Sequence, residues 1–211
     1  MLSARLLAPV TLAAGALALS ACATTPYTGP VEITRFVAQN PAGLGQGPII
    51  VYFPDEMSNE AARTAFKSAI EAELAKLGYT IAQQEGPDIQ VAVVRTTRTP
   101  IAAIEERRSP VSVGVGGQTG SFGSGLGMGI GINLGGGREG PSAMTQLEVR
   151  ITKADQTTLW EGRAQMATGV KSPYSQVNTS ARTLAAGLFK DFPGGNGETV
   201  TIDAKKLQGS K

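Results

Sequence analysis

The side chains that most often carry chemistry are scarce in this sequence of 211 residues. It contains no histidine and a single cysteine, Cys22. Without histidine, Ser-His-Asp and Cys-His catalysis, imidazole metal ligation and the commonest general base near neutral pH are excluded. A single cysteine excludes an intramolecular disulfide. The groups left for chemistry are the Cys22 thiol and the carboxylates.

The carboxylates are scattered along the chain. Glu71 and Glu73 stand two positions apart in an expected helix and therefore point in different directions. The sequence contains neither the spacing of a calcium-binding loop nor a G-x-S-x-G nucleophile motif. A carboxylate-only hydrolase stays open, because two such groups can meet only in the fold. We expect a solvated surface instead, with no catalytic residue, no metal and no cofactor.

Cys22 ends a distinctive N-terminal pattern. Arg5 and the amino terminus are positive, and Leu6–Leu19 is an uncharged, largely Ala/Leu stretch that is too short for a comfortable membrane span. Leu19–Cys22 (LSAC) then resembles the lipobox of bacterial lipoproteins. The resemblance implies transfer of diacylglycerol to the Cys22 thiol, cleavage before Cys22 and acylation of the new amino group. Several acyl chains make such an anchor effectively permanent.

The residue after the cysteine bears on localisation. It is Ala23, not aspartate, and by resemblance to the lipoprotein sorting pattern this favours the outer membrane, with the domain facing the periplasm. We therefore divide the chain into a signal peptide (1–21), a lipidated tether (22–30), one domain (31–203) and a tail (204–211). The membrane, reached through the lipid anchor, is the first expected partner.

The bulk charge argues against nucleic acid as a partner. The formal net charge is +2, from 19 basic and 17 acidic residues, and nucleic-acid affinity depends largely on Lys and Arg that neutralise phosphates. Hydrophobic residues make up 41% of the chain, which is enough for a packed core.

Hydrophobic periodicity predicts two helices among several strands. Strands are expected over Val31–Val37, Ile49–Phe53, Tyr79–Gln83, Asp88–Thr97, Ser142–Lys153, Thr158–Met166 and Thr199–Asp203, the last at a sheet edge. A helix should run from an N-cap at Ser58 to Leu77, with Gly78 as its stop, and a second from about Ser175 to Phe192. This order predicts an α+β two-layer sandwich, with a mostly antiparallel sheet and both amphipathic helices on one face.

Several short stretches in a fixed order resemble domain-of-unknown-function family 4136, a family of bacterial envelope lipoproteins. They are the lipobox at Cys22, the helix end Ala75–Tyr79, the strand led by Asp88, the stretch Leu159–Ala164 and the terminal stretch Leu188–Pro193. The family has no agreed activity, so the resemblance implies no catalytic residue. Residues 110–141 are an insertion in this pattern.

The insertion is rich in glycine: residues 114–137 hold 12 of the 27 glycines. Glycine alternates there with an apolar set, Leu126, Met128, Ile130, Ile132 and Leu134. Alternation predicts a β-hairpin with one aliphatic face, a possible interaction surface. A flexible loop and a small-xxx-small membrane helix are the alternatives, and a phosphate-binding loop is disfavoured.

Basic residues surround this insertion, and a lone tryptophan lies beyond it. The five arginines are expected to form a solvated rim, although lipid headgroups or an anionic glycan are alternatives; they are Arg95, Arg98, Arg107, Arg108 and Arg138. Trp160 is expected to anchor the core against the first helix.

These observations predict a non-catalytic accessory component of the outer membrane, which binds another envelope protein or associates with itself. A periplasmic lipid- or small-molecule-binding module, with its ligand between sheet and hairpin, is the alternative.

Overall fold

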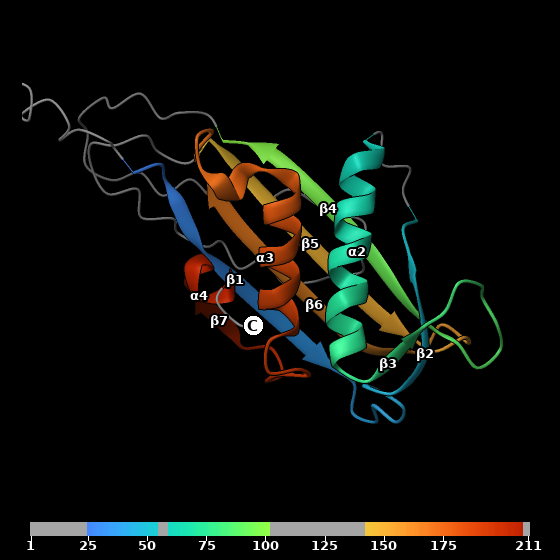
Figure 1. The fold of residues 1–211 in the computed structure, drawn as a ribbon. Coiled ribbons are helices and arrows are strands. Elements are labelled where there is room, and N and C mark those ends of the chain that lie inside the picture. Colours follow the sequence, from blue (N-terminus) through green and yellow to red (C-terminus); the bar gives the residue numbers. More distant parts are fainter. Residues whose placement is uncertain (1–24, 55–58, 102–141, 209–211) are drawn as a thin grey trace, which may run out of the picture.

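The computed structural model describes residues 25–54, 59–101 and 142–208. Seven strands form one sheet, and two long helices cover the same face of it (Figure 1). Four of the six strand pairings are antiparallel. The predicted two-layer α+β class and the mostly antiparallel sheet are therefore confirmed.

The strands lie in the order β3-β2-β4-β5-β6-β1-β7. Their bounds are β1 (Thr28–Val37), β2 (Gly47–Tyr52), β3 (Tyr79–Ile81), β4 (Gln90–Pro100), β5 (Ala143–Thr152), β6 (Thr158–Thr168) and β7 (Thr199–Ile202). Both parallel pairings involve β2, with β3 on one side and β4 on the other. β7 pairs with β1 at the edge of the sheet, as predicted.

Helix α2 (Glu60–Lys76) connects the parallel strands β2 and β3, as a βαβ crossover requires. Its N-cap is Asn59, whose side-chain oxygen accepts a hydrogen bond from the Ala62 amide at 3.0 Å. The prediction of Ser58 as the N-cap is wrong, because the residue with extended backbone before the first helical turn is Asn59. Gly78 follows with φ +103°, a conformation that suits glycine and ends the helix as predicted.

Helix α3 (Val177–Phe189) follows a short 3-10 turn at Pro173–Ser175. The sequence extended this helix to Phe192, which is wrong by three residues. Lys190 has extended backbone (ψ 131°) and Asp191 has φ +56°, so the helical bonding pattern stops at Phe189. The apolar periodicity continues only because the residues after the helix pack on the same core.

The tail also departs from expectation. Residues 204–208 form helix α4 (Ala204–Gln208), and Ala204 is 2% exposed. Leu207 packs against the core, and the Gln208 amide donates a weak hydrogen bond to Thr183 at 3.4 Å. The prediction of a loose tail from 204 onward is therefore wrong for these residues, since burial of Ala204 and Leu207 holds the short helix on α3.

The core lies between the helices and the sheet. In β5, Leu147, Val149 and Ile151 are buried and alternate with polar residues. In β4 the buried side chains are Ala92 and Val94. Val91 and Val93 therefore lie on the face away from the helices, where they are half-buried.

Candidate functional site

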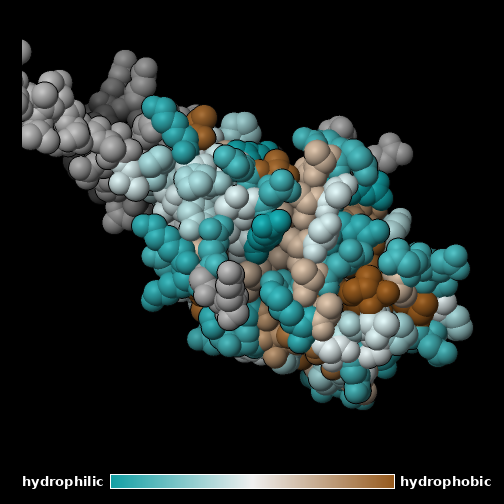
Figure 2. Space-filling view, in the orientation of Figure 1, coloured by the Kyte–Doolittle hydropathy of each residue, from teal (hydrophilic) through white to brown (hydrophobic). Residues whose placement is uncertain are grey.

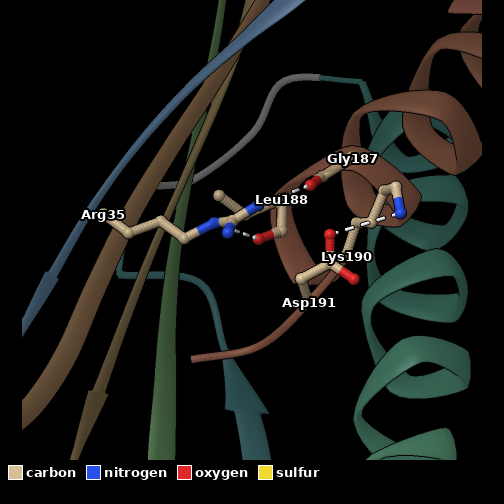
Figure 3. A network of polar contacts seen from close by, with 5 residues as sticks. All are labelled: Arg35, Gly187, Leu188, Lys190 and Asp191. Carbon is tan, nitrogen blue, oxygen red and sulfur yellow. Dashed lines mark hydrogen bonds and ion pairs between the residues drawn. The ribbon is translucent and has the colours of Figure 1, made fainter. Parts of the chain in front are cut away.

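Arg35 is the one charged residue among the buried side chains of the described residues, at 5% exposure. It projects from the helix-facing side of β1 toward the C-terminal end of α3 (Figure 3). Its Nε donates to the carbonyl oxygen of Leu188 at 3.0 Å, and its Nη2 donates to that of Gly187 at 3.1 Å. Both carbonyls belong to the last helical turn, where intrahelical donors run out. The Gly187 carbonyl also accepts from the Lys190 amide at 3.3 Å, whereas the donor to the Leu188 carbonyl is Arg35. Arg35 therefore caps α3 from the sheet.

The electrostatic setting agrees with this capping role. Burial lowers the pKa of the Arg35 guanidinium, and the carboxylate of Asp191 opposes that shift. A guanidinium nevertheless stays protonated in proteins, so it donates hydrogen bonds and does not exchange protons. The partial negative charge at a helix C-terminus further favours a cation here. Gly194, with φ +79°, lies so close to the Arg35 side chain that a Cβ at that position would overlap it.

Trp160 anchors the core, but against a different helix from the one expected. Its ring stacks on Phe189 of α3 with 5.6 Å between centroids, and lies 5.2 Å from the ring of Phe192. Its indole N–H donates to the carbonyl oxygen of Pro193 at 2.9 Å. The expectation that Trp160 packs on the first helix is corrected: the register of β6 places it beneath the end of α3. The adjacent Gly162 is required because a Cβ there would overlap the indole.

The terminal stretch Leu188–Pro193 and the Trp160 stretch therefore have a shared structural explanation. The first supplies the Leu188 carbonyl that Arg35 caps and the rings that cover Trp160, and the second supplies the indole beneath them. The charged side chains of these stretches form ion pairs, Lys190 with Asp191 and Glu161 with Arg150. We conclude that these residues fix the end of α3 to the sheet.

The face of the sheet away from the helices carries a ladder of opposite charges. Glu148 on β5 pairs with Arg163 on β6 at 2.7 Å, and Arg150 pairs with Glu161 across the same two strands. Each of these side chains is at least a quarter exposed. Cross-strand pairs of this kind stabilise a sheet modestly and leave little net charge. The two ion pairs are neutral overall, so they give this face no excess of either sign to attract a charged ligand.

In the described part of the chain, no group of three or more Asp, Glu, Cys or His side chains is arranged to hold a metal ion. Among the same residues, no helix combines the length and apolarity needed to cross a bilayer.

A groove runs between α2 and α3 on the helix side, and Figure 2 shows it as a pale stripe between hydrophilic flanks. Its volume is about 940 Å³. The α2 side is formed mainly by small residues: Ala61, Thr64, Ala65, Ser68 and Ala72. Arg182 and Thr183 contribute from α3, and Gln208 from α4. The groove is open to solvent, and its small side chains reflect the close approach of the two helices.

The ends of four strands meet where the N-terminal tether enters the domain. The Gly169 amide donates to the Tyr27 carbonyl at 2.9 Å, and the Ser142 amide donates to the Thr168 carbonyl at 2.9 Å. The Ile101 amide donates to the Ser142 carbonyl at 2.9 Å. The tether and both ends of the insertion therefore leave the domain at one end of the sheet, which we call the tether end (Figure 1).

The site residues predicted from sequence lie mostly outside the described residues. These are the lipidation residue Cys22 and the apolar set Leu126, Met128, Ile130, Ile132 and Leu134. Of the predicted arginine rim, Arg95 lies opposite Glu148 on the outer face of β4. Arg98 turns to the helix side and donates to the Ser175 carbonyl at 2.7 Å. The sequence did not lead us to predict a role for Arg35. Its position was nevertheless a signal, because Arg35 continues the alternation of Val31 and Ile33 along one face of the strand.

The strand order and the helices that cover one face of the sheet define a two-layer α+β domain with an open seven-stranded sheet. The chain matches the family described as "Domain of unknown function (DUF4136)" over residues 47–194, well over half of its length. The chain therefore belongs to this family, as the stretches quoted from the sequence predicted. A comparison with curated proteins finds no match.

Two solved structures show distant similarity. A PDZ domain protein from Parabacteroides distasonis aligns with a TM-score of 0.49 and 14% identity, over 84% of this chain and 38% of that one. This chain thus spans well under half of that protein. A PelC dodecamer from Paraburkholderia phytofirmans aligns with a TM-score of 0.35 and 10% identity, over 74% of this chain and 93% of that one. Similarities this distant carry no argument about function.

Proposed function

We propose that this protein is a non-catalytic lipoprotein of the outer membrane, anchored through Cys22, whose domain faces the periplasm as an accessory component of the envelope. The observation that carries the proposal is the sequence Leu19–Cys22, with the only thiol of the chain at the acceptor position after an apolar leader. β1 begins at Thr28, six residues after Cys22, so a folded domain follows the anchor almost at once.

Two observations support a non-catalytic role. The buried polar cluster around Arg35 has a complete structural explanation, because its hydrogen bonds cap α3. Four charged side chains on the outer face form two ion pairs across β5 and β6. These polar groups stabilise the fold, which supports an accessory role.

The anchor is tested by replacing the acceptor. Cys22→Ser should abolish acylation, so that outer-membrane fractions lose the protein and uncleaved precursor, which keeps its apolar leader, accumulates. Intact-mass spectrometry of the native protein should show the added acyl chains, and Ser20→Ala, which keeps a small residue before the cysteine, is the control. A Cys22→Ser protein that is processed and fractionates like the parent, together with a native mass lacking acyl chains, contradicts the proposal.

The partner of the domain is proposed to be another envelope protein or a second copy of this chain, bound through the apolar positions of the insertion. Deleting residues 111–137 should leave the domain folded and remove proteins that are cross-linked to it in intact cells. An unchanged set of cross-linked proteins would overturn this part of the proposal. Native mass spectrometry of the same preparations tests the alternative of a retained lipid or small molecule.

A further inference from the structure

The tether end carries an exposed apolar side chain beside basic ones. Val170 is 78% exposed, the highest value among the large hydrophobic residues of the described part. It lies in the turn Gly169–Ser172, whose first amide is hydrogen-bonded to Tyr27. Lys171 follows directly and is exposed. A single exposed valine is common on protein surfaces. A role for Val170 therefore has to be argued from its position relative to the tether and to the surrounding charges.

Charge is distributed unevenly between the two ends of the sheet. Val31, Arg98, Thr145 and Met166 lie at one level of the sheet, and the segments between this level and the tether end are 25–31, 98–101, 142–145 and 166–178. They contain Arg98 and Lys171 and no acidic residue, whereas Glu32 and Glu148 lie farther from this end. The loops at the opposite end are 82–89, 153–157 and 190–198. They hold five acidic residues (Glu85, Asp88, Asp155, Asp191 and Glu198) and two basic ones (Lys153 and Lys190). On the helix side, Glu60 begins α2 and lines the groove together with Asn178, so one acidic residue lies near these basic segments.

The length of the tether determines which end can reach a leaflet. Four residues lie between Cys22 and Tyr27, so even a fully extended chain spans only about 17 Å between them. The central strands have 10 or 11 residues, and at about 3.3 Å per residue they are roughly 35 Å long. An acylated Cys22 therefore keeps the tether end close to the lipid, while the acidic end lies on the far side of the domain.

We propose that the turn Gly169–Ser172 is a membrane contact, in which Val170 enters the headgroup region of the leaflet and Lys171 lies among lipid phosphates. This inference rests on the lipid anchor proposed above and adds an orientation to it. Anionic lipid attracts the basic tether end and repels the acidic end, so both effects turn the tether end toward the leaflet. The contact adds no new anchor; it restrains how the anchored domain stands on the membrane.

The test uses the full-length lipidated protein with an environment-sensitive fluorophore at Val170→Cys. Because the native thiol is acylated, the label reacts only at the introduced cysteine. In phosphatidylethanolamine/phosphatidylglycerol vesicles (3:1), we expect a blue-shifted emission and at least two-fold quenching by a nitroxide carried on the lipid headgroup. Glu85→Cys, at the acidic end, is the matched control and should be neither shifted nor quenched.

Charge dependence is tested on the same labelled protein. Adding Lys171→Glu to Val170→Cys should reduce the quenching by half or more, and so should phosphatidylcholine vesicles. Equal, solvent-like emission from the Val170 and Glu85 labels, on protein whose acyl mass is confirmed, overturns the contact and leaves the anchor standing. Absence of acyl chains from native protein overturns both. Circular dichroism of each labelled variant verifies that it is folded.

Discussion

At the scale of single residues, the buried guanidinium of Arg35 has the largest expected effect on stability. Arg35→Met would keep most of the apolar contact of the side chain and remove both donors to the carbonyls of Gly187 and Leu188. The Gly187 carbonyl would keep the Lys190 amide at 3.3 Å, but the Leu188 carbonyl would lose its donor. Because a buried acceptor without a partner costs about 1–3 kcal/mol, we expect the free energy of unfolding to fall by that amount in urea titrations followed by Trp160 fluorescence.

The matched control for this prediction is Arg163→Met on the outer face. Arg163 is 57% exposed and pairs with Glu148 across two strands. Exposed ion pairs contribute at most about 1 kcal/mol. If both methionine variants lose the same stability, the capping role assigned to Arg35 is wrong.

Tyr79 is expected to make stability depend on alkaline pH. Its hydroxyl accepts a hydrogen bond from the Gly45 amide at 2.7 Å, and burial raises the pKa of the phenol. A raised pKa means that the folded state favours the protonated phenol. This contribution is therefore complete below the unfolded pKa of about 10 and is lost as the pH rises through the folded value.

Tyr79→Phe should flatten that alkaline loss and lower stability at neutral pH by about 1 kcal/mol, because the Gly45 amide loses its acceptor. Urea midpoints measured between pH 7 and pH 11 provide the test. Tyr52→Phe is the control, since Tyr52 is 45% exposed. An alkaline limb that is as steep in Tyr79→Phe as in the parent would contradict the assignment.

At the scale of elements, substitutions at Asn59 and Ser58 show which of these two neighbouring polar residues is the N-cap of α2. Asn59 accepts from the Ala62 amide, so Asn59→Ala should cost about 1 kcal/mol of stability. Asn59→Asp should retain it, because aspartate is an equally good N-cap. Ser58→Ala should be neutral. Thermal unfolding followed by circular dichroism measures the stability of all three variants. A larger loss of stability in Ser58→Ala than in Asn59→Ala would show that Ser58 is the N-cap.

The elements also show how far local sequence predicts structure. Strand positions and both long helices follow from alternation and from three- and four-residue spacing, which depend on neighbours in the sequence. The end of α3 does not, because apolar residues continue at helical spacing to Phe192 while the chain leaves the helix at Lys190. The sequence did not predict α4, because five residues are too few to show a helical period. Burial against α3 and β1 stabilises this helix.

At the scale of the whole molecule, the insertion is expected to be separable from the fold. The β4–β5 pairing reaches Pro100 opposite Ala143, and the Ile101 amide is hydrogen-bonded to Ser142. Replacing residues 102–141 with Asn-Gly would close this pair with a two-residue turn. Because a shorter loop costs less entropy to close, stability should not fall and should rise by up to about 2.5 kcal/mol.

Urea titration of the shortened chain checks this, with Trp160 emission showing that the core is unchanged. A hairpin that packs on the domain would instead contribute buried apolar area. A loss of more than about 1 kcal/mol on its removal would therefore contradict separability and favour a packed hairpin.

The sequence by itself determined the family, the α+β class and the two helices that cover the sheet. These follow from residue types and periodicities within short stretches, and each stretch carries its own signal. Only the tertiary structure decided that Arg35 caps α3, that Trp160 lies under α3 instead of α2, and that the tether and the insertion share one end of the sheet. Those facts depend on strand order and register, which bring β1 and β6 together from residues more than 120 positions apart, and no local pattern specifies such a pairing.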